Sequence, residues 1–274
     1  MQIREYSLQE GWYPRDREEV SRFLSKHDRS GPFSRAAISP HAGWFYSGRL
    51  SAIASSCLQP EAETVAVLGG HLPAGSPRLF AMEDAVKTPF GPMPIDTELR
   101  SVLQKDLGGT EDRFRDNTVE VLLPMVRFFF PQAKLLWLRL PSEISSFDAG
   151  KIIAQAAAEL NRKINVLAST DLTHYGRNYG FSPQGTGTAA LRWVRDVNDA
   201  NFISAVTAGQ IDEVLRCAER ERSACSAGAV LGAMGFAEEA GLGSARLLEY
   251  ATSVDALDGE TPDSFVGYAA FAFG

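Results

Sequence analysis

Short apolar runs alternate with helical patterns along most of this 274-residue chain. Apolar runs typical of buried strands cover residues 36–40, 64–68, 134–140 and 164–168, and helical patterns cover 50–58, 97–105, 148–161 and 189–208. Strands that alternate with helices favour a largely parallel central sheet with helices on both faces. No break in composition divides the chain, so the sequence predicts an α/β fold in a single domain spanning residues 1–274.

Three of the four histidines follow strands of this predicted sheet. His41, His71 and His174 lie just past the runs that end near residues 40, 68 and 168. Ligands bind at the carboxyl edge of the strands in an open α/β sheet. Taken singly, His41 could cap a tight turn, and the glycines before His71 could simply shape one. Together, the three histidines predict a metal site or an acid/base site.

Residues 169–176 read Ser-Thr-Asp-Leu-Thr-His-Tyr-Gly and are predicted to form a turn after a buried strand. Asp171 lies three residues before His174, close enough for a carboxylate to fix the tautomer of the imidazole and raise its basicity. We therefore expect Asp171 and His174 to take part in acid/base chemistry. The alternative is a helix N-cap beside a buried, paired imidazole.

Cys225 is a further candidate for the same site, because it precedes a predicted helix. A helix N-terminus lowers the pKa of a thiol and favours the thiolate, the form that binds metal. The alternative is a small buried apolar residue, which is how we interpret Cys57 and Cys217. Glu120 could be a carboxylate that supports the ligands of the site, or it could be a solvated helix residue. Two imidazoles and a thiolate suit Fe(II), Cu or Zn, and the ligand types alone do not choose among them.

The charge balance excludes some classes of partner. The net charge is −7, which argues against a general nucleic-acid binder. No apolar run approaches the length needed to span a bilayer, and residues 1–10 are too polar for a secretory leader. Three cysteines do not make a disulfide framework. The expectation is a cytoplasmic protein with neither nucleic-acid nor membrane partners.

Several motifs, in order over nearly the whole chain, resemble the Memo family, called AmmeMemoRadiSam system protein B in prokaryotes. They are Gly-Trp-Tyr-Pro at 11–14, Pro-His-Ala-Gly-Trp-Phe-Tyr-Ser-Gly at 40–48, Gly-Gly-His at 69–71, Thr-Pro-Phe-Gly at 88–91, Val-Glu-Val-Leu-Leu-Pro at 119–124, the segment 169–176 and Cys225. That family is similar in fold to the class III extradiol ring-cleavage dioxygenases, which bind Fe(II) and open catechols with O2.

The resemblance implies a mononuclear non-haem site with Fe(II) as the favoured metal and with redox or dioxygenase-like chemistry on a small organic substrate. It implies His41, His71 and Cys225 as metal ligands, Asp171 and His174 beside the metal, and Trp12 and Tyr46 as pocket walls. It also implies radical-SAM and AMMECR-type partner proteins. Because a cysteine takes the place of the dioxygenases' carboxylate ligand, catechol cleavage does not follow from the resemblance.

Asn117 marks a departure from the family pattern. Family members carry Glu-His-Ser where this chain has Asp116-Asn117-Thr118, and an asparagine does not exchange a proton near neutral pH. His174 is then the one imidazole left for proton transfer. Asn117 favours a second hypothesis, in which the same pocket binds a small ligand or a peptide without turnover.

Overall fold

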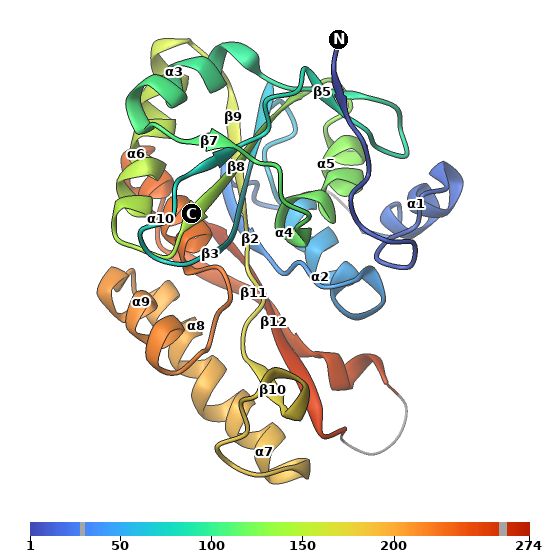
Figure 1. The fold of residues 1–274 in the computed structure, drawn as a ribbon, viewed down its shortest axis with the longest axis vertical. Helices are drawn as coiled ribbons and strands as arrows, with labels where there is room; N and C mark the ends of the chain where they lie inside the picture. The colour runs from blue at the N-terminus through green and yellow to red at the C-terminus, as the bar shows by residue number, and fades with distance from the viewer. Residues whose placement is uncertain (28–30, 258–261) are drawn as a thin grey trace.

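A computed structural model describes residues 1–27, 31–257 and 262–274. Within these residues, nine strands form one sheet in the order β10-β12-β2-β9-β3-β8-β4-β7, with β11 paired to β12 (Figure 1). The strands of this sheet are β2 (Ala36–Ser39), β3 (Thr64–Leu72), β4 (Leu79–Phe80), β7 (Thr110–Glu111), β8 (Lys134–Pro141), β9 (Ile164–Ser169), β10 (His174–Gly176), β11 (Ala245–Thr252) and β12 (Ser264–Phe273). A small second sheet joins β1 (Ile3–Arg4), β5 (Ala85–Val86) and β6 (Met93–Pro94).

The centre of the large sheet is parallel. Strand β9 lies between β2 and β3, β3 pairs with β8, and all three pairings are parallel. Antiparallel pairs flank these four strands: among the described residues of this sheet, β12 pairs with β2, β10 and β11, and β4 pairs with β8. The predicted α/β fold with a largely parallel sheet is confirmed.

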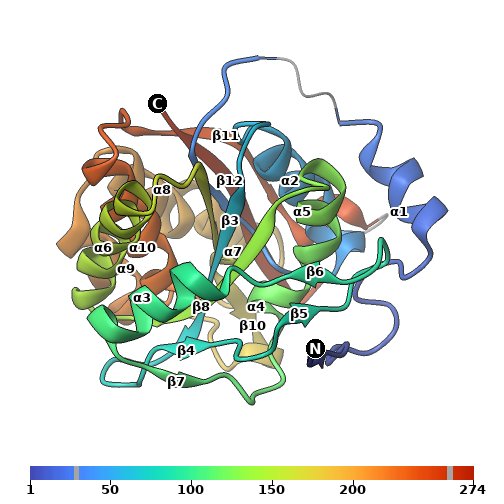
Figure 2. The same cartoon turned by 90° about the horizontal axis from the view of Figure 1, so that it is seen from above.

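Helices cover both faces of the sheet, and Figure 2 shows α6 and α10 on one side of the strands and α2 and α5 on the other. The alternation of side chains along a strand supplies both cores: Leu68 of β3 packs into one cluster and Val67 into the other. The helices are α1 (Arg17–Leu24), α2 (Trp44–Ser56), α3 (Thr97–Leu107), α4 (Asn117–Glu120), α5 (Leu123–Phe129), α6 (Ser145–Glu159), α7 (Gly187–Trp193), α8 (Asp199–Thr207), α9 (Ile211–Arg220) and α10 (Ala227–Glu239).

Two local expectations are corrected at the ends of strands. His71 does not follow β3 but lies within it, because β3 continues to Leu72, and the backbone of His71 has a φ of 57°. Residues 169–176 are not a single turn either, since His174 begins β10, which pairs with β12. Pairing with a distant strand therefore decides the conformation of both segments.

No helix among the described residues is both long and apolar enough to cross a membrane.

Candidate metal centre

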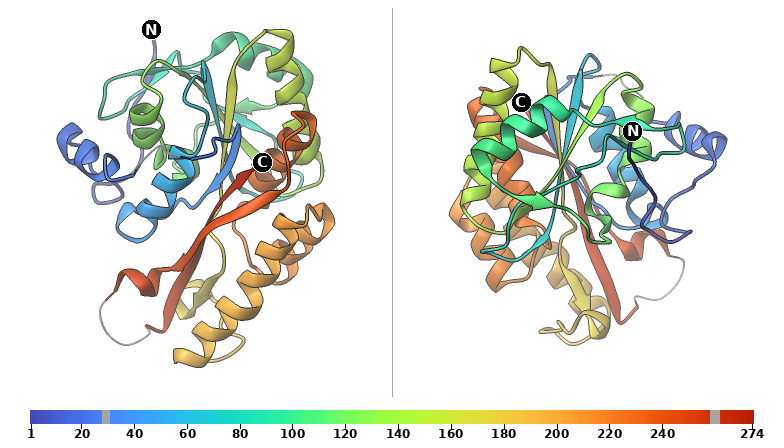
Figure 3. Two further views of the ribbon diagram at one scale, coloured as in Figure 1. Left: turned by 180° about the vertical axis from the view of Figure 1, so that it is seen from behind. Right: turned by 45° about the horizontal axis from the view of Figure 1, so that its top comes forward.

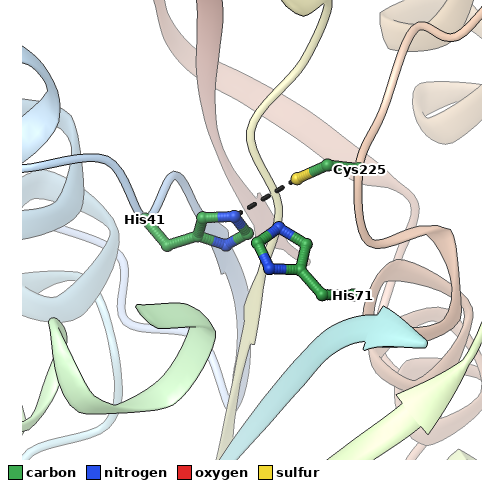
Figure 4. A group of neighbouring side chains, drawn as sticks. All are labelled: His41, His71 and Cys225. Atoms are coloured by element: carbon green, nitrogen blue, oxygen red, sulfur yellow. Dashed lines mark hydrogen bonds between the residues drawn. The ribbon is translucent and has the colours of Figure 1, made fainter. Parts of the chain in front are cut away.

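Three side chains from distant parts of the chain meet at the carboxyl edge of the parallel strands (Figure 4). His41 follows β2, His71 lies near the end of β3, and Cys225 comes from the loop before α10. One ligand atom from each lies within 4.8 Å of the others. The distance between Nε2 of His41 and Sγ of Cys225 is 3.2 Å, and the two imidazole rings lie edge to face with centroids 4.8 Å apart. The sequence prediction that these residues come together is confirmed.

Each imidazole is held at Nδ1 by a second side chain. Nδ1 of His41 lies 2.6 Å from Oγ of Ser169, the last residue of β9. Nδ1 of His71 lies 3.0 Å from Oδ2 of Asp116. The carboxylate of Asp116 accepts only and so places a proton on Nδ1 of His71, and both partners hold their rings with Nε2 left to bind a metal, the arrangement that metal-ligating histidines usually show.

A buried arginine supports the His71 side of the site. Arg139 of β8 is 3 % exposed and donates from Nε to the carbonyl of Gly70 at 3.0 Å. Its guanidinium also lies 3.1 Å from Asp116 and 3.2 Å from Asp112. Sequence reasoning missed Asp116, Ser169 and Arg139. A single arginine inside the apolar run 134–140 was the available signal, because arginine is almost never buried without a partner.

The electrostatics of the three residues favour a thiolate. Burial raises the pKa of Cys225, but the neighbouring His41 and His71 outweigh burial and lower it to about 5. Burial lowers the pKa of His41. Burial also acts to lower the pKa of His71, yet its bonds to Asp116 and Cys225 raise it to about 10. Once metal binding displaces the proton of His71, two imidazoles and an ionised thiolate are a donor set that fits Zn, Cu or Fe.

A cavity of about 850 Å³ adjoins this centre. His41 and His71 line it, and so do five of the residues predicted for the site: Trp12, Tyr46, Asn117, Asp171 and His174. The volume is in the range of pockets that take small organic ligands.

Asp171 and His174 are neighbours in this cavity, but each has another hydrogen-bond partner. Oδ1 of Asp171 accepts from the backbone N–H of His41 at 2.7 Å. Nδ1 of His174 donates to the carbonyl of Leu172 at 3.2 Å. The carbonyl of Leu172, and not Asp171, takes Nδ1 of His174, so the orientation of this ring by Asp171 stays a prediction.

The protonation of His174 follows from its partner. A carbonyl only accepts, so Nδ1 carries the proton in the neutral ring and Nε2 is the unprotonated nitrogen. Burial lowers the pKa of His174, against the charge of Asp171, which raises it. Burial raises the pKa of Asp171. His174 is thus a neutral imidazole able to accept a proton at Nε2.

Asn117 and Glu120 have structural partners. Nδ2 of Asn117 donates to the carbonyl of His41 at 2.9 Å, so it fixes the backbone of the first ligand. Glu120 is buried, and its carboxylate accepts from the N–H of Ser7 at 2.8 Å and from the hydroxyl of Tyr13 at 2.9 Å. Burial excludes the solvated alternative for Glu120, and its bonds fasten the N-terminal segment that carries Trp12.

The chain is similar to known proteins over nearly its whole length. A family model described as "Memo-like protein" matches residues 4–272. The chain is 26% identical over 298 residues to a "MEMO1 family protein" of Pyrobaculum arsenaticum, covering 100% of this chain and 99% of that protein. It is 31% identical to a "MEMO1 family protein" of Methanococcoides burtonii, covering 85% of this chain and 84% of that protein. A crystal structure of an uncharacterized protein of Escherichia coli K12 aligns with a TM-score of 0.49 and 12% identity. The alignment covers 86% of this chain and 98% of that protein.

Proposed function

The chain belongs to the family of Memo-like proteins, and we propose that it holds one non-haem metal ion between His41, His71 and Cys225. Fe(II) is the metal we propose first. We further propose that the centre supports redox or dioxygenase-like chemistry on a small organic ligand in the adjoining cavity.

One observation carries the proposal: three donor atoms converge, and the two imidazoles among them are already held by other side chains. Ser169 and Asp116 take Nδ1 of His41 and His71, so neither ring has to reorient to bind a metal. Three protein ligands beside a cavity are typical of catalytic metal sites, which keep a position for water or substrate.

Other residues around the centre would transfer a proton, hold the ligand His41 in place and bind the organic ligand. Bound Fe(II) would supply electron transfer and a binding position for the ligand. His174 would accept a proton from a ligand hydroxyl at Nε2. Asp171 and Asn117 hold the N–H and the carbonyl of His41, which keeps the first ligand in place. Trp12 and Tyr46 provide aromatic walls for an organic ring.

Asn117 favours the alternative proposal of a binding module. Its side chain is committed to the backbone of His41 and cannot exchange a proton. In this alternative the same cavity captures a small ligand or a peptide, and the metal centre serves binding alone.

The metal content of the purified chain tests the site. We expect about one metal ion per chain, and we expect His41→Ala, His71→Ala and Cys225→Ser each to lose most of it, because structural ligands are not replaced by water without a large loss of affinity. His27→Ala and Cys57→Ser are the matched controls, since neither belongs to the cluster. Elemental analysis by mass spectrometry provides the count and identifies the metal.

Unchanged metal in all three ligand variants would overturn the assignment of the site. Copper or zinc at full occupancy, lost in the same variants, would support the site and overturn the choice of iron.

A further inference from the structure

A second, smaller cavity of about 350 Å³ reaches the same centre. His71, His174 and Tyr179 line both cavities, so the two meet at these side chains. The remaining ligands are divided between them. His41 lines the larger cavity and is 1 % exposed, whereas Cys225 lines the smaller one and is partly exposed. His41, His71 and Cys225 thus lie where two adjoining cavities meet.

The smaller cavity differs from the larger one in charge. Among the described residues that line either cavity, Arg222 is the one lysine or arginine, and it lies on the smaller. The larger cavity has two acidic side chains, Glu10 and Asp171. The fixed charge of Arg222 therefore favours an anion at the smaller cavity over the larger one.

Arg222 is held in place before any ligand arrives. Its backbone has a φ of 52°, and its guanidinium donates to the carbonyls of Gly180 at 3.1 Å and Tyr179 at 3.0 Å. The guanidinium also lies 5.0 Å from the ring centre of Phe181. These bonds use two of the five N–H donors of an arginine, so three remain for a ligand or for water. Because the guanidinium is already ordered, it loses little further conformational entropy when it binds an anion.

The width of the smaller cavity limits what can pass. Ala218 of α9 and Ala224 form part of its wall beside Cys225, so a larger side chain at either position would reduce the space in front of Sγ. We propose that this cavity is a second entrance, through which a small monoanion reaches the Cys225 side of the centre while the organic ligand occupies the larger cavity. The biological meaning of this inference rests on the proposed metal centre.

The alkylation of Cys225 by iodoacetate and iodoacetamide tests the entrance in the full chain as purified. In both reactions the thiolate displaces iodide and forms a thioether, and the reagents are similar in size but differ in charge. The rate at Cys225, measured by peptide mass, is divided by the rate in the denatured chain. We expect the normalised iodoacetate-to-iodoacetamide ratio to exceed one by about threefold to tenfold, as for electrostatic steering at a charged opening.

Four variants and a salt series separate charge from structure. We expect Arg222→Gln to bring the ratio to within about twofold of one, Arg222→Lys to keep most of it, and added salt to lower it in the wild type. Ala218→Leu should slow both reagents equally by narrowing the passage. Tyr46→Trp, which places a larger side chain on the wall of the larger cavity, should change neither alkylation rate by more than about twofold, because Cys225 does not line that cavity.

Two results would overturn the second entrance: a ratio that Arg222→Gln leaves unchanged, or rates that Tyr46→Trp slows as much as Ala218→Leu does. If the sole role of Arg222 were to hold the loop at Tyr179 and Gly180 in place, its loss would raise both alkylation rates together. The iodoacetate-to-iodoacetamide ratio would then stay constant. A bound metal slows both reagents alike, so the ratio does not depend on the metal measurement, and either proposal can fail without the other.

Discussion

His71 is held at its side chain and at its backbone. Asp116 accepts from Nδ1, and Arg139 binds both Asp116 and the carbonyl of Gly70. A Cβ on Gly70 would lie 2.8 Å from the Cα of Ser226, the neighbour of Cys225, so glycine is required where the end of β3 approaches the loop of the third ligand. The left-handed φ of His71 is uncommon for a residue other than glycine, and these contacts hold it there.

Replacing Asp116 by asparagine should weaken metal binding. The amide keeps the shape of the side chain but removes the charged acceptor at Nδ1 of His71, and loss of such a partner typically costs about tenfold to a hundredfold in metal affinity. Competition with a chelator of known affinity measures the change. Asp106→Asn, an exposed substitution of the same kind, is the control. Equal affinities in the two variants would contradict a role for Asp116 at the metal.

The helical segment from α7 to α8 positions the strand that carries His174. One turn of π-helix, Val194–Asn198, interrupts this segment, and such turns are frequent at functional sites. Nδ2 of Asn198 donates to Oγ1 of Thr173 at 2.9 Å, and Oδ1 of Asp199 accepts from the N–H of Thr173 at 3.1 Å. Oδ2 of Asp199 accepts from the hydroxyl of Tyr250 at 2.7 Å. Two successive residues thus hold the residue that precedes His174.

Asp199 should make the stability of the fold depend on pH. Burial raises its pKa from 3.8 to about 6, although the bonds from Thr173 and Tyr250 act to lower it. The folded state therefore binds the proton more tightly than the unfolded state, and the stability this group contributes below about pH 4 is lost as the pH rises to about 6. The loss is on the order of 3 kcal/mol at most.

Urea unfolding of the wild type and Asp199→Asn between pH 4 and 8 measures this effect. Asparagine imitates the protonated acid, so the two proteins should be similarly stable near pH 4 and the variant should become the more stable one above pH 6. Other titrating groups cancel in the difference. A difference that stays constant over this range would show that Asp199 does not titrate there.

Segments from the whole chain build the site. Trp12 comes from the N-terminal segment, Tyr46 from α2, His174 from β10 and Tyr268 from β12. Figure 3 shows β12 running from the central strands to the part of the molecule where α7 and β10 lie. Strand β12 pairs with both β2 and β10, so one strand ties the segment of His174 to the strand that ends beside His41.

The proposed turnover would need all of these parts together, and oxygen uptake by the Fe(II)-loaded protein with a panel of catechols tests it. We expect uptake by the wild type and a loss on the order of a hundredfold in His174→Ala, the usual size of a general acid–base contribution. The iron content of the variant should be unchanged, because His174 is not in the ligand cluster. Uptake that is insensitive to His174→Ala would contradict its role, and no uptake with any catechol would favour the binding module.

The sequence by itself determined the α/β fold and the placement of His41 and His71 at one edge of the sheet, and the family resemblance added Cys225 to them. The reason is local: apolar runs define parallel strands, and the carboxyl ends of parallel strands share one edge. Only the tertiary structure decided which partner each polar group takes. Asp171 accepts from the backbone of His41, 130 positions away, and Asp116 accepts from the imidazole of His71, 45 positions away. Such bonds, and the place of Arg222 at a second cavity, depend on how distant elements pack, which no local pattern in the chain encodes.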